Sequence, residues 1–302
     1  MSAVLKSRIE SITQSLLQPT SANGVHARSG LFETVINGVD ALITSLREAG
    51  TEVLRFPPVM SRALVEKSGY LKSFPHLLGC VSCLHGEEST IRSFVEGPAS
   101  DDGDWVDGLA ATDLVLTPAA CYPLYPLVAE RGAVRAQGEA FDVASYCFRR
   151  EASHEPGRLQ SFRMREYVCM GAPHVALGFR QRWLERAQEM AQRLALPYKV
   201  LTASDPFFGR AGKIMAMSQV EQALKFELLI PVNSEEQPTA CMSFNYHQDH
   251  FGTTWGLRTS AQEVAHTACV AFGIDRLGLA LFATHGLDLQ KWPASARQSL
   301  SL

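Results

Sequence analysis

Apolar residues recur at helical spacing in the first part of the chain and at strand-like spacing over much of the remainder. Residues 1–50 are mostly of helix-forming type, and the pattern over residues 31–49 predicts an amphipathic helix that ends near Gly50. The adjacent Pro57 and Pro58 interrupt regular structure, and a short helix is expected after them, up to Lys67. The N-terminal segment is therefore predicted to be helical.

Short apolar runs, bounded by polar or proline-containing segments, predict several strands. They cover residues 77–84, 91–95, 114–116, 146–148, 167–170, 223–232 and 240–246. Polar loops are expected at 99–107 and 152–161, a long amphipathic helix at 173–194 and an apolar helix at 272–283. Helices followed by strands and a final helix predict an α+β fold with an antiparallel sheet, in a single domain over residues 1–302.

Composition narrows the class of protein. The formal net charge of -3 argues against a chain dominated by polyanion binding. Seven cysteines leave at least one outside any intramolecular disulfide, which favours reduced thiols and a cytoplasmic localisation. The N-terminus lacks the apolar core of a signal peptide, and no run of about 18 apolar residues predicts a membrane span.

The most informative stretch joins residues 147–151 to residues 162–167. Arg149 and Glu151 occupy alternate positions, so on a strand both side chains face the same side of a sheet. An arginine fork matches a phosphate, a carboxylate accepts from an exocyclic amine, and an aromatic residue on the returning strand offers a surface for a purine. Taken alone, these residues are equally consistent with a salt-bridged surface hairpin.

A second motif, residues 271–277, places Gly273 and Arg276 where a strand gives way to a helix. Glycine permits the close approach of a ligand, and arginine can stack on a purine. Alone the motif is weak, because glycine and arginine at this spacing are common at helix starts. The chain has no glycine-rich phosphate loop of the P-loop or Rossmann kind, so a bound nucleotide must be held by other residues.

Together with the Arg-Phe-Pro-Pro segment at residues 55–58, these two segments resemble motifs two, three and one of the class II aminoacyl-tRNA synthetases. The resemblance spans nearly the whole chain. It implies an antiparallel sheet flanked by helices, a homodimer interface at motif one, and ATP and Mg²⁺ in the reaction.

The same resemblance implies the residues that bind ATP. Arg149 and Arg276 would be catalytic, with Arg149 on the α-phosphate and Glu151 on the adenine edge. Tyr167 and Arg276 would sandwich the base, and Phe162 belongs to the same ATP-binding set.

Within class II, the chain is most similar to the seryl-tRNA synthetases. Thr-Pro-Ala-Ala at residues 117–120 resembles their strand-end motif, and residues 225–231 resemble a later strand. Two departures stand out: Cys121 replaces a glutamate of most bacterial seryl enzymes, and residues 243–249 match only in part, with Asp249 displaced by one position. The resemblance therefore leaves Glu227 and Ser243 as candidates for the ATP and magnesium site. Asn245, Arg149 and Glu166 are candidates for binding the amino acid.

Cys121, Glu166 and Cys269 each lie beside one of the motifs, so the fold implied by the resemblance can bring them into one pocket. Two thiolates and a carboxylate suit Zn²⁺ and leave a fourth position for a substrate amine. Each cysteine alone is more typical of a small buried hydrophobic residue; resemblance to the atypical zinc-dependent seryl enzymes favours the metal site. The Cys80–Cys83 pair lacks a second pair at zinc-ribbon spacing and is interpreted as part of a core strand.

The acceptor of the amino acid follows from a further resemblance, to the amino acid:[carrier protein] ligases, shortened relatives of the atypical seryl enzymes. They load glycine or alanine onto the phosphopantetheine arm of a small acidic carrier protein. Few residues precede motif one, and the net charge is negative, so tRNA is not expected as the acceptor.

The segment at about residues 204–224 is the predicted carrier-binding insertion. It offers an apolar and basic face through Phe207, Phe208, Arg210 and Lys213, although an ordinary solvated helix would show the same pattern. Gly171, where seryl enzymes tend to carry a glutamate, hints at a small substrate side chain. The alternatives are a truncated seryl-type tRNA synthetase and a non-catalytic regulatory paralogue that binds amino acids.

Overall fold

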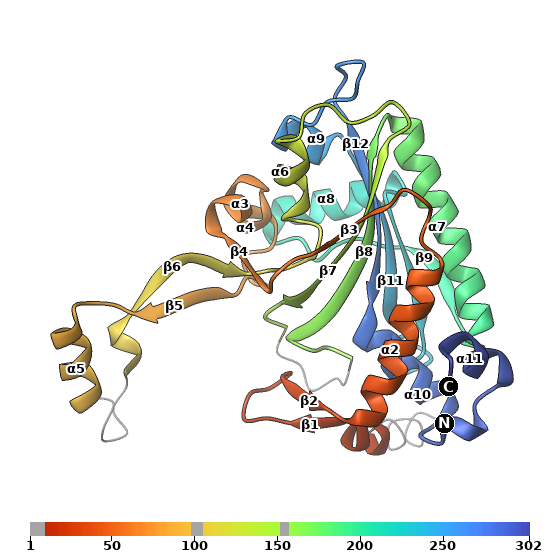
Figure 1. Cartoon of the computed structure of the whole chain (residues 1–302), viewed down its shortest axis with the longest axis horizontal. Coiled ribbons are helices and arrows are strands. Elements are labelled where there is room, and N and C mark those ends of the chain that lie inside the picture. Colours follow the sequence, from red (N-terminus) through yellow and green to blue (C-terminus); the bar gives the residue numbers. More distant parts are fainter. Residues whose placement is uncertain (1–9, 98–104, 152–156) are drawn as a thin grey trace.

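The computed structural model describes residues 10–97, 105–151 and 157–302. It is built around a seven-stranded sheet with the order β3-β7-β8-β12-β11-β10-β9 (Figure 1). The strands are β3 (Glu52–Arg55), β7 (Glu139–Phe148), β8 (Ser161–Gly171), β12 (His266–Gly273), β11 (Thr239–Gln248), β10 (Lys225–Ile230) and β9 (Lys199–Thr202). β3 runs parallel to β7, and the other neighbours pair antiparallel, which confirms the predicted antiparallel sheet.

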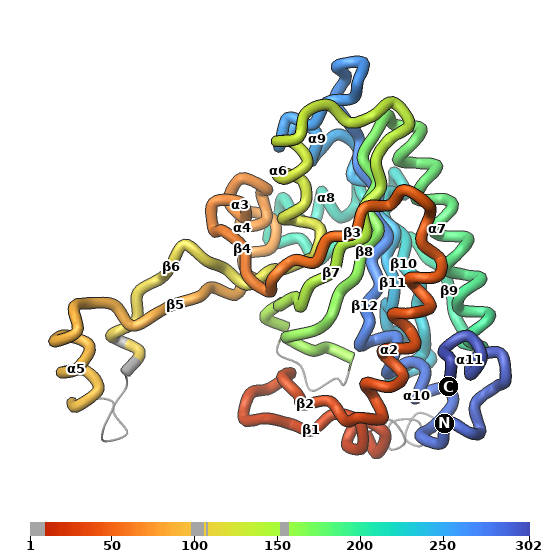
Figure 2. The backbone as a smooth tube through the Cα atoms, in the orientation of Figure 1, coloured from red at the N-terminus to blue at the C-terminus, as the bar shows by residue number. Residues whose placement is uncertain are grey.

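Helices lie on both sides of this sheet, which confirms the α+β class. The first side carries α2 (Gly30–Ser45), α7 (Pro173–Arg193), α10 (Ile274–His285) and α11 (Ala294–Leu300) around the main apolar core. The second side carries α6 (Leu124–Ala129) and α9 (His250–Trp255) over another core. The helices α3 (Arg62–Lys67), α4 (Tyr70–Ser73) and α8 (Gly209–Glu221) lie on this second side too (Figures 1 and 2).

The long helices follow from local sequence signals. The Ser29 side chain caps α2 by accepting a hydrogen bond from the backbone N–H of Phe32 at 3.3 Å. This helix ends at Ser45, four residues before the predicted end. α7 begins at Pro173, a residue suited to the first turn because it has no N–H to leave unpaired, and its bounds match the prediction closely.

An arm projects from the second side of the sheet (Figure 1). It consists of β4 (Val59–Ser61), β6 (Leu109–Leu116) and β5 (Cys80–Leu84), with α5 (Glu88–Glu96) and the short 3₁₀ helix η1 (Trp105–Gly108) near its tip. Residues 91–95 are therefore helical, and the prediction of a strand there was wrong. Cys80 and Cys83 do lie on a strand, but both are exposed, so the prediction that they belong to the core was also wrong.

The N-terminal segment is only partly helical. Residues 10–16 form a helix, but β1 (Leu17–Pro19) and β2 (His26–Arg28) form a hairpin before α2. The predicted loops at 99–107 and 152–161 fall partly outside the described residues. No helix in the described ranges is long and apolar enough to cross a membrane.

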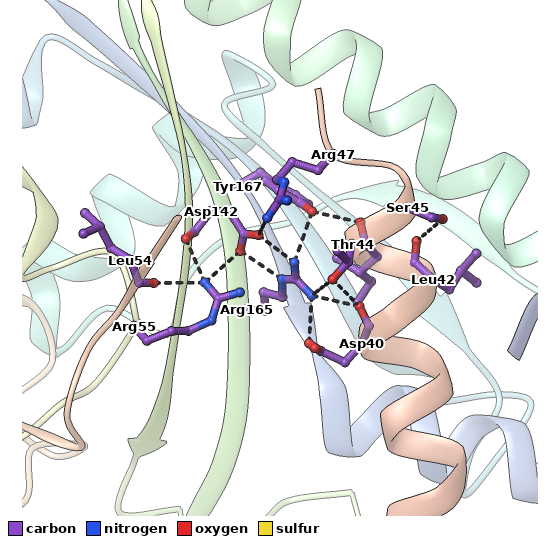
Figure 3. A network of polar contacts seen from close by, with 11 residues as sticks. Asp40, Leu42, Thr44, Ser45, Arg47, Leu54, Arg55, Asp142, Arg165 and Tyr167 are labelled. Carbon is purple, nitrogen blue, oxygen red and sulfur yellow. Dashed lines mark hydrogen bonds and ion pairs between the residues drawn. The ribbon is translucent and has the colours of Figure 1, made fainter. Parts of the chain in front are cut away.

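A polar network fixes α2 against β3, β7 and β8 (Figure 3). Arg165 donates to both oxygens of Asp142, at 2.9 and 2.6 Å, and to a carboxylate oxygen of Asp40 at 2.9 Å. Arg55 and Arg47 also donate to Asp142, at 3.1 and 3.3 Å. Burial opposes the charge on Asp142, but Arg165 and Arg55 outweigh it and hold the pKa of this carboxyl below its ordinary value.

Candidate functional site

A cavity of about 1260 Å³, part of it open to solvent, lies against the sheet face that α2 and α7 leave uncovered. Its floor comes from alternate residues of β8, β10, β11 and β12, because side chains two apart on a strand face the same side. One row across the strands runs Glu227, Ser243, Ala271 and Glu166, each paired with the next. The small Ala271 in this row leaves open space between the polar residues.

Arg149, Glu151, Phe162 and Arg276 line one end of the cavity. The guanidinium carbon of Arg149 lies 5.7 Å from the centre of the Phe162 ring, and its Nε donates to the Pro118 carbonyl at 3.1 Å. Arg276 donates to two backbone carbonyls, at 2.9 and 3.1 Å. Backbone acceptors thus hold both cations in place. Two fixed arginines beside an aromatic ring suit a ligand with phosphate and a flat base.

Tyr167 does not belong to this end, and the prediction that it stacks on adenine was wrong. Its ring is buried on the other face of the sheet, stacked on Trp183 at 4.3 Å, and its hydroxyl donates to the Ile43 carbonyl at 2.8 Å. Neighbouring strand residues face opposite sides, so Tyr167 cannot share a pocket with Glu166. Phe162, four residues before Glu166, is the aromatic residue of β8 that faces the cavity.

Cys121, Glu166 and Cys269 come together inside the same cavity. The backbone N–H of Cys121, in the loop after β6, donates to Glu166 Oε1 at 3.0 Å. Cys269 lies on β12, two residues before Ala271, which is the cross-strand partner of Glu166. All three residues are buried. The fold therefore brings two sulfurs and a carboxylate from three distant segments to one place.

The electrostatics of this cluster favour either protonation of its side chains or a bound cation that offsets their negative charge. Burial, followed by the nearness of Glu166, raises the pKa of both the Cys121 and Cys269 thiols. Burial also raises the pKa of Glu166, although a hydrogen bond with Cys121 opposes this. Across residues 10–97, 105–151 and 157–302, the structure shows no group of three or more His, Cys, Asp or Glu side chains that could hold a metal ion.

His247 is a residue of the cavity to which the sequence assigned no role. Its Nε2 lies 3.7 Å from Cys269 Sγ and its Nδ1 lies 3.0 Å from Thr267 Oγ1. Burial lowers the pKa of His247 to about 4, so the ring is neutral near pH 7. Asn245 donates to Cys269 Sγ at 3.3 Å. The alternation of Ser243, Asn245 and His247 along β11 is the sequence signal that places His247 here.

A partly buried ion pair joins the floor of the cavity to the loop before α8. Lys225 Nζ lies 2.6 Å from Asp205 Oδ1 and 3.0 Å from Glu227 Oε1. Gln219, on α8, donates to the other oxygen of Asp205 at 2.8 Å. Burial opposes the charge on Asp205, but Lys225 holds the pKa of its carboxyl below the ordinary value. Asp205 thus connects the cavity floor to the C-terminal part of α8 through Gln219.

The predicted carrier-binding segment forms α8 and the loop before it. Phe208 is exposed, but Phe207 is half-buried and stacks on Phe74 with ring centres 5.1 Å apart. Phe207 therefore contributes little to the apolar and basic face predicted for this segment and instead anchors the loop. The exposed residues of α8 include Arg210, Lys213, Ile214 and Met217.

Gly171 does not report on the substrate side chain, so that interpretation was wrong. It ends β8, is not among the residues that line the cavity, and packs beside α7. A Cβ at this position would lie 3.1 Å from Gly138 Cα and 3.2 Å from a methyl of Val175. Its small size serves the close packing of strand and helix.

Comparison with known proteins supports the same picture. No protein-family model matches the chain. The chain is 58% identical over 294 residues to amino acid–[acyl-carrier-protein] ligase 1 of Bradyrhizobium diazoefficiens, which covers 97% of the chain and 90% of the relative. Ligase 2 of the same organism is 55% identical, over 97% of the chain and 88% of the relative.

More distant relatives are longer. The type-2 serine–tRNA ligase of Methanopyrus kandleri is 28% identical over 88% of the chain, which spans only 53% of that enzyme. A crystal structure of M. kandleri SerRS with A. aeolicus tRNASec superposes with a TM-score of 0.82 at 20% identity, over 98% of this chain and 60% of the other. That likeness confirms the class II synthetase fold. Because the two Bradyrhizobium proteins match over nearly their whole length, the chain belongs to the amino acid–[acyl-carrier-protein] ligase family.

Proposed function

We propose that the chain activates a small amino acid, glycine or alanine, with ATP and transfers it to the phosphopantetheine thiol of a carrier protein. The names of the two Bradyrhizobium relatives support an amino acid and an acyl carrier protein as substrates. One observation carries the proposal: a single cavity is lined by Arg149, Arg276 and Phe162, by the Cys121–Glu166–Cys269 cluster, and by Asp205 and Pro206 of the loop before α8.

ATP binds at the arginine end of the cavity. Arg149 contacts the α-phosphate, and Glu151 accepts from the exocyclic amine of adenine. Phe162 and Arg276 enclose the base, with Phe162 in the place first expected of Tyr167. The support is geometric, since Arg149, Glu151, Phe162 and Arg276 all line the cavity.

Glu227 and Ser243 would hold Mg²⁺ beside the phosphates of ATP. The two residues are cross-strand partners on the cavity floor and supply the oxygen ligands that this ion prefers. Mg²⁺ takes one or two carboxylates and completes its shell with phosphate oxygens and water. One carboxylate and one hydroxyl at this position therefore meet its needs.

The chemistry of the cluster fits Zn²⁺, because thiolates and carboxylates are among its usual ligands. Cys121, Glu166 and Cys269 would hold the ion and leave a fourth position for substrate. When bound, the ion supplies a Lewis-acidic position for the α-amine of the amino acid. Glu166 and Asn245 orient the amino acid so that its carboxylate points toward the phosphate held by Arg149.

The reaction then needs no protein nucleophile. In the first step, a carboxylate oxygen of the amino acid bonds to the α-phosphorus of ATP, and the bond to pyrophosphate breaks. Arg149 and Arg276 stabilise the charge that develops there. In the second step, the carrier sulfur bonds to the acyl carbon, the bond to AMP breaks, and the thiol proton passes to solvent. The products are a thioester and AMP.

The carrier docks on the outer face of α8. Arg210 and Lys213 are exposed cations that suit an acidic partner, and Phe208 is 57% exposed beside them. Exposed apolar side chains along α8, such as Ile214 and Met217, provide the desolvated contact that such interfaces require. The segment at about residues 204–224 thus serves as the carrier-binding insertion.

A homodimer forms through the motif-one segment. β3 is an edge strand of the sheet, and Val53 on it is 43% exposed, so its outer edge is free to pair with a second copy. All seven cysteines are free, which supports a reducing, cytoplasmic compartment. The names of the two Bradyrhizobium relatives favour a carrier protein over tRNA as acceptor.

Pyrophosphate exchange across the twenty amino acids tests the first step, and transfer to a holo acyl carrier protein or to tRNA tests the second. We expect exchange with glycine or alanine, transfer to the carrier, and about one zinc per chain by metal analysis. Cys269→Ala should remove zinc and exchange together, whereas Cys169→Ala, a buried thiol on the other sheet face, should retain both.

Three results would contradict the proposal. Transfer to tRNA but not to the carrier indicates a truncated seryl-type enzyme. The absence of exchange with every amino acid indicates a regulatory paralogue. Normal exchange by a zinc-free Cys269→Ala protein removes the metal from amino-acid recognition.

A further inference from the structure

The N-terminal hairpin of β1 and β2 lies outside the three sequence motifs, but it contacts the two that are proposed to bind the nucleotide (Figure 1). The Gly24 carbonyl, in the turn of the hairpin, accepts from the backbone N–H of Gln160 at 2.8 Å. The Gln160 carbonyl in turn accepts from the backbone N–H of Arg149 at 2.9 Å. The hairpin therefore supports the segment that carries the proposed phosphate-binding arginine, although the proposed reaction gives it no role.

Arg28, at the end of β2, extends this contact to the third motif. Its Nε donates to Asp275 Oδ1 at 2.7 Å, and its Nη2 donates to the Ser161 carbonyl at 3.3 Å. Asp275 directly precedes Arg276 in the first turn of α10. The residues that line the cavity include Asp275 but not Arg28, so Arg28 acts on a nucleotide only through its partners.

The Asp275 carboxylate joins the two sides of the proposed base site, which are Phe162 and Arg276. Its Oδ2 accepts from the backbone N–H of Arg163 at 2.6 Å, and its Oδ1 accepts from the Arg163 side chain at 2.8 Å. Arg163 directly follows Phe162 on β8, just as Asp275 directly precedes Arg276 on α10. One carboxylate therefore sets the spacing between the strand that carries the aromatic ring and the helix turn that carries the guanidinium.

Burial makes this carboxylate dependent on its cations. The Asp275 side chain is 1% exposed, whereas those of Arg28 and Arg163 are 16% and 17% exposed. A buried charge is costly unless it is paired and hydrogen-bonded. Arg163 is shared with Glu33 on α2, to which it donates two bonds of 2.7 and 3.0 Å. Among the described ion pairs, Arg28 is therefore the cation that pairs with Asp275 alone.

We propose that Arg28 is a positioning residue for ATP, which acts through Asp275 to fix Arg276 relative to Phe162. This inference rests on the proposed function, because it takes Phe162 and Arg276 as the two sides of the base site. The N-terminal hairpin is then a support of the nucleotide site, although it lies outside all three motifs. Loss of Arg28 should weaken the use of ATP and leave the binding of the amino acid at the cluster unchanged.

Steady-state pyrophosphate exchange, with ATP and the amino acid varied in turn, tests this role. Arg28→Ala should raise the KM for ATP about 10-fold, within the loss of roughly 100-fold that a misplacement of ~1 Å causes. The KM for the amino acid should not change. Partial unfolding lowers kcat through the amount of active enzyme and leaves both KM values unchanged, so this split separates positioning from stability.

Arg28→Lys and Asp275→Asn test the contact between the two residues. Lysine keeps the charge but has no fork with which to reach both Asp275 and the Ser161 carbonyl, so its KM for ATP should lie between those of the wild type and Arg28→Ala. Asp275→Asn removes the charge shared by both arginines and should raise the KM for ATP at least as much as Arg28→Ala.

Ser29→Ala is the matched control. Ser29 is the next residue in the chain, and its side chain caps α2 through the bond to Phe32. Its loss should lower the melting temperature, because helix caps contribute to stability. The KM for ATP should remain at the wild-type value, since the Ser29 bond leads to α2 and not to Asp275.

Three results would overturn the proposal: an unchanged KM for ATP in folded Arg28→Ala, equal rises in the KM for ATP and for the amino acid, or a rise in Ser29→Ala as large as in Arg28→Ala. Failure of the proposed function is seen separately, as a wild-type protein that exchanges pyrophosphate with no amino acid. In that case the dissociation constant for ATP, measured by calorimetry, decides the role of Arg28, and Arg28→Ala should raise it by the same factor.

Discussion

The network around Asp142 gives the sharpest prediction about stability (Figure 3). The Asp142 side chain is fully buried and that of Arg165 is 1% exposed, so no water can replace either partner. Removing one partner of a buried pair costs about 3–5 kcal/mol. Because Arg165 keeps its bonds to Asp40 and Thr44, we expect Asp142→Asn to lower the free energy of unfolding by about 3 kcal/mol, the low end of that range.

Asp40→Asn is the matched control. Asp40 contacts the same guanidinium at 2.9 Å, but its side chain is 52% exposed. An exposed ion pair contributes about 0–1 kcal/mol, so this variant should remain close to the wild type. Urea denaturation at one protein concentration, followed by tryptophan fluorescence, measures both, since a dimer would make stability depend on concentration. Equal losses in the two variants would refute the assignment of the effect to burial.

Asp142 also accounts for part of the expected loss of folding stability at low pH. The folded pKa of Asp142 lies below its ordinary value of 3.8, so the unfolded chain binds the proton more readily. This contribution to stability is therefore full above roughly pH 5 and is lost as pH falls through 3.8 toward the folded pKa. In Asp142→Asn the decline in stability between pH 5 and pH 3 should be shallower than in the wild type. A wild-type slope in the variant would show that other carboxylates cause the decline.

Two further predictions concern the site. His247→Ala removes a neighbour of Cys269 Sγ and should weaken zinc binding by about 10- to 100-fold. Competition with a chromophoric chelator measures the zinc affinity. An unchanged affinity would show that the contact between His247 and Cys269 is incidental. Phe208→Ala should weaken transfer to a holo carrier with little change in thermal stability, whereas Phe207→Ala should destabilise the protein by at least about 0.5–1.5 kcal/mol, because it loses the stack on Phe74. The reverse ranking in the two assays would invalidate the assignment of Phe207 as the anchor.

The predicted elements succeed where one periodicity dominates. The helix at 173–194 and the strands at 223–232 and 240–246 appear as α7, β10 and β11 because each buries one consistent face. In α5 the apolar Ile91, Phe94 and Val95 stand at positions i, i+3 and i+4, which is helical spacing, and a short run of them was mistaken for a strand.

For single residues of the candidate site, too, the periodicity of the strand decides which predictions are correct. Alternation along β8 requires that Tyr167 and Glu166 face opposite sides, so the sequence already excluded placing both in one pocket. Phe162 lies four residues before Glu166 on β8, so its side chain faces the same side of the sheet. It is therefore the aromatic residue that can share a pocket with Glu166. No local pattern, by contrast, joins Arg28 on β2 to Asp275 on α10, because their contact depends on how distant elements pack beside the sheet.

The space for ligands in the cavity depends on small side chains as well as on the residues proposed to bind those ligands. Cys269, Ala271 and Gly273 alternate along β12 and face the cavity together. Ala271 stands opposite Glu166 and Ser243 and leaves room between the cluster and the proposed magnesium-binding residues. A Cβ on Gly273 would lie 3.3 Å from the Cys241 carbonyl oxygen, which is a tight contact, so glycine lets β12 lie close to β11 where the chain turns into α10. One strand thus supplies the Cys269 sulfur, the open space beside Glu166, and the turn into α10 that leads to Arg276.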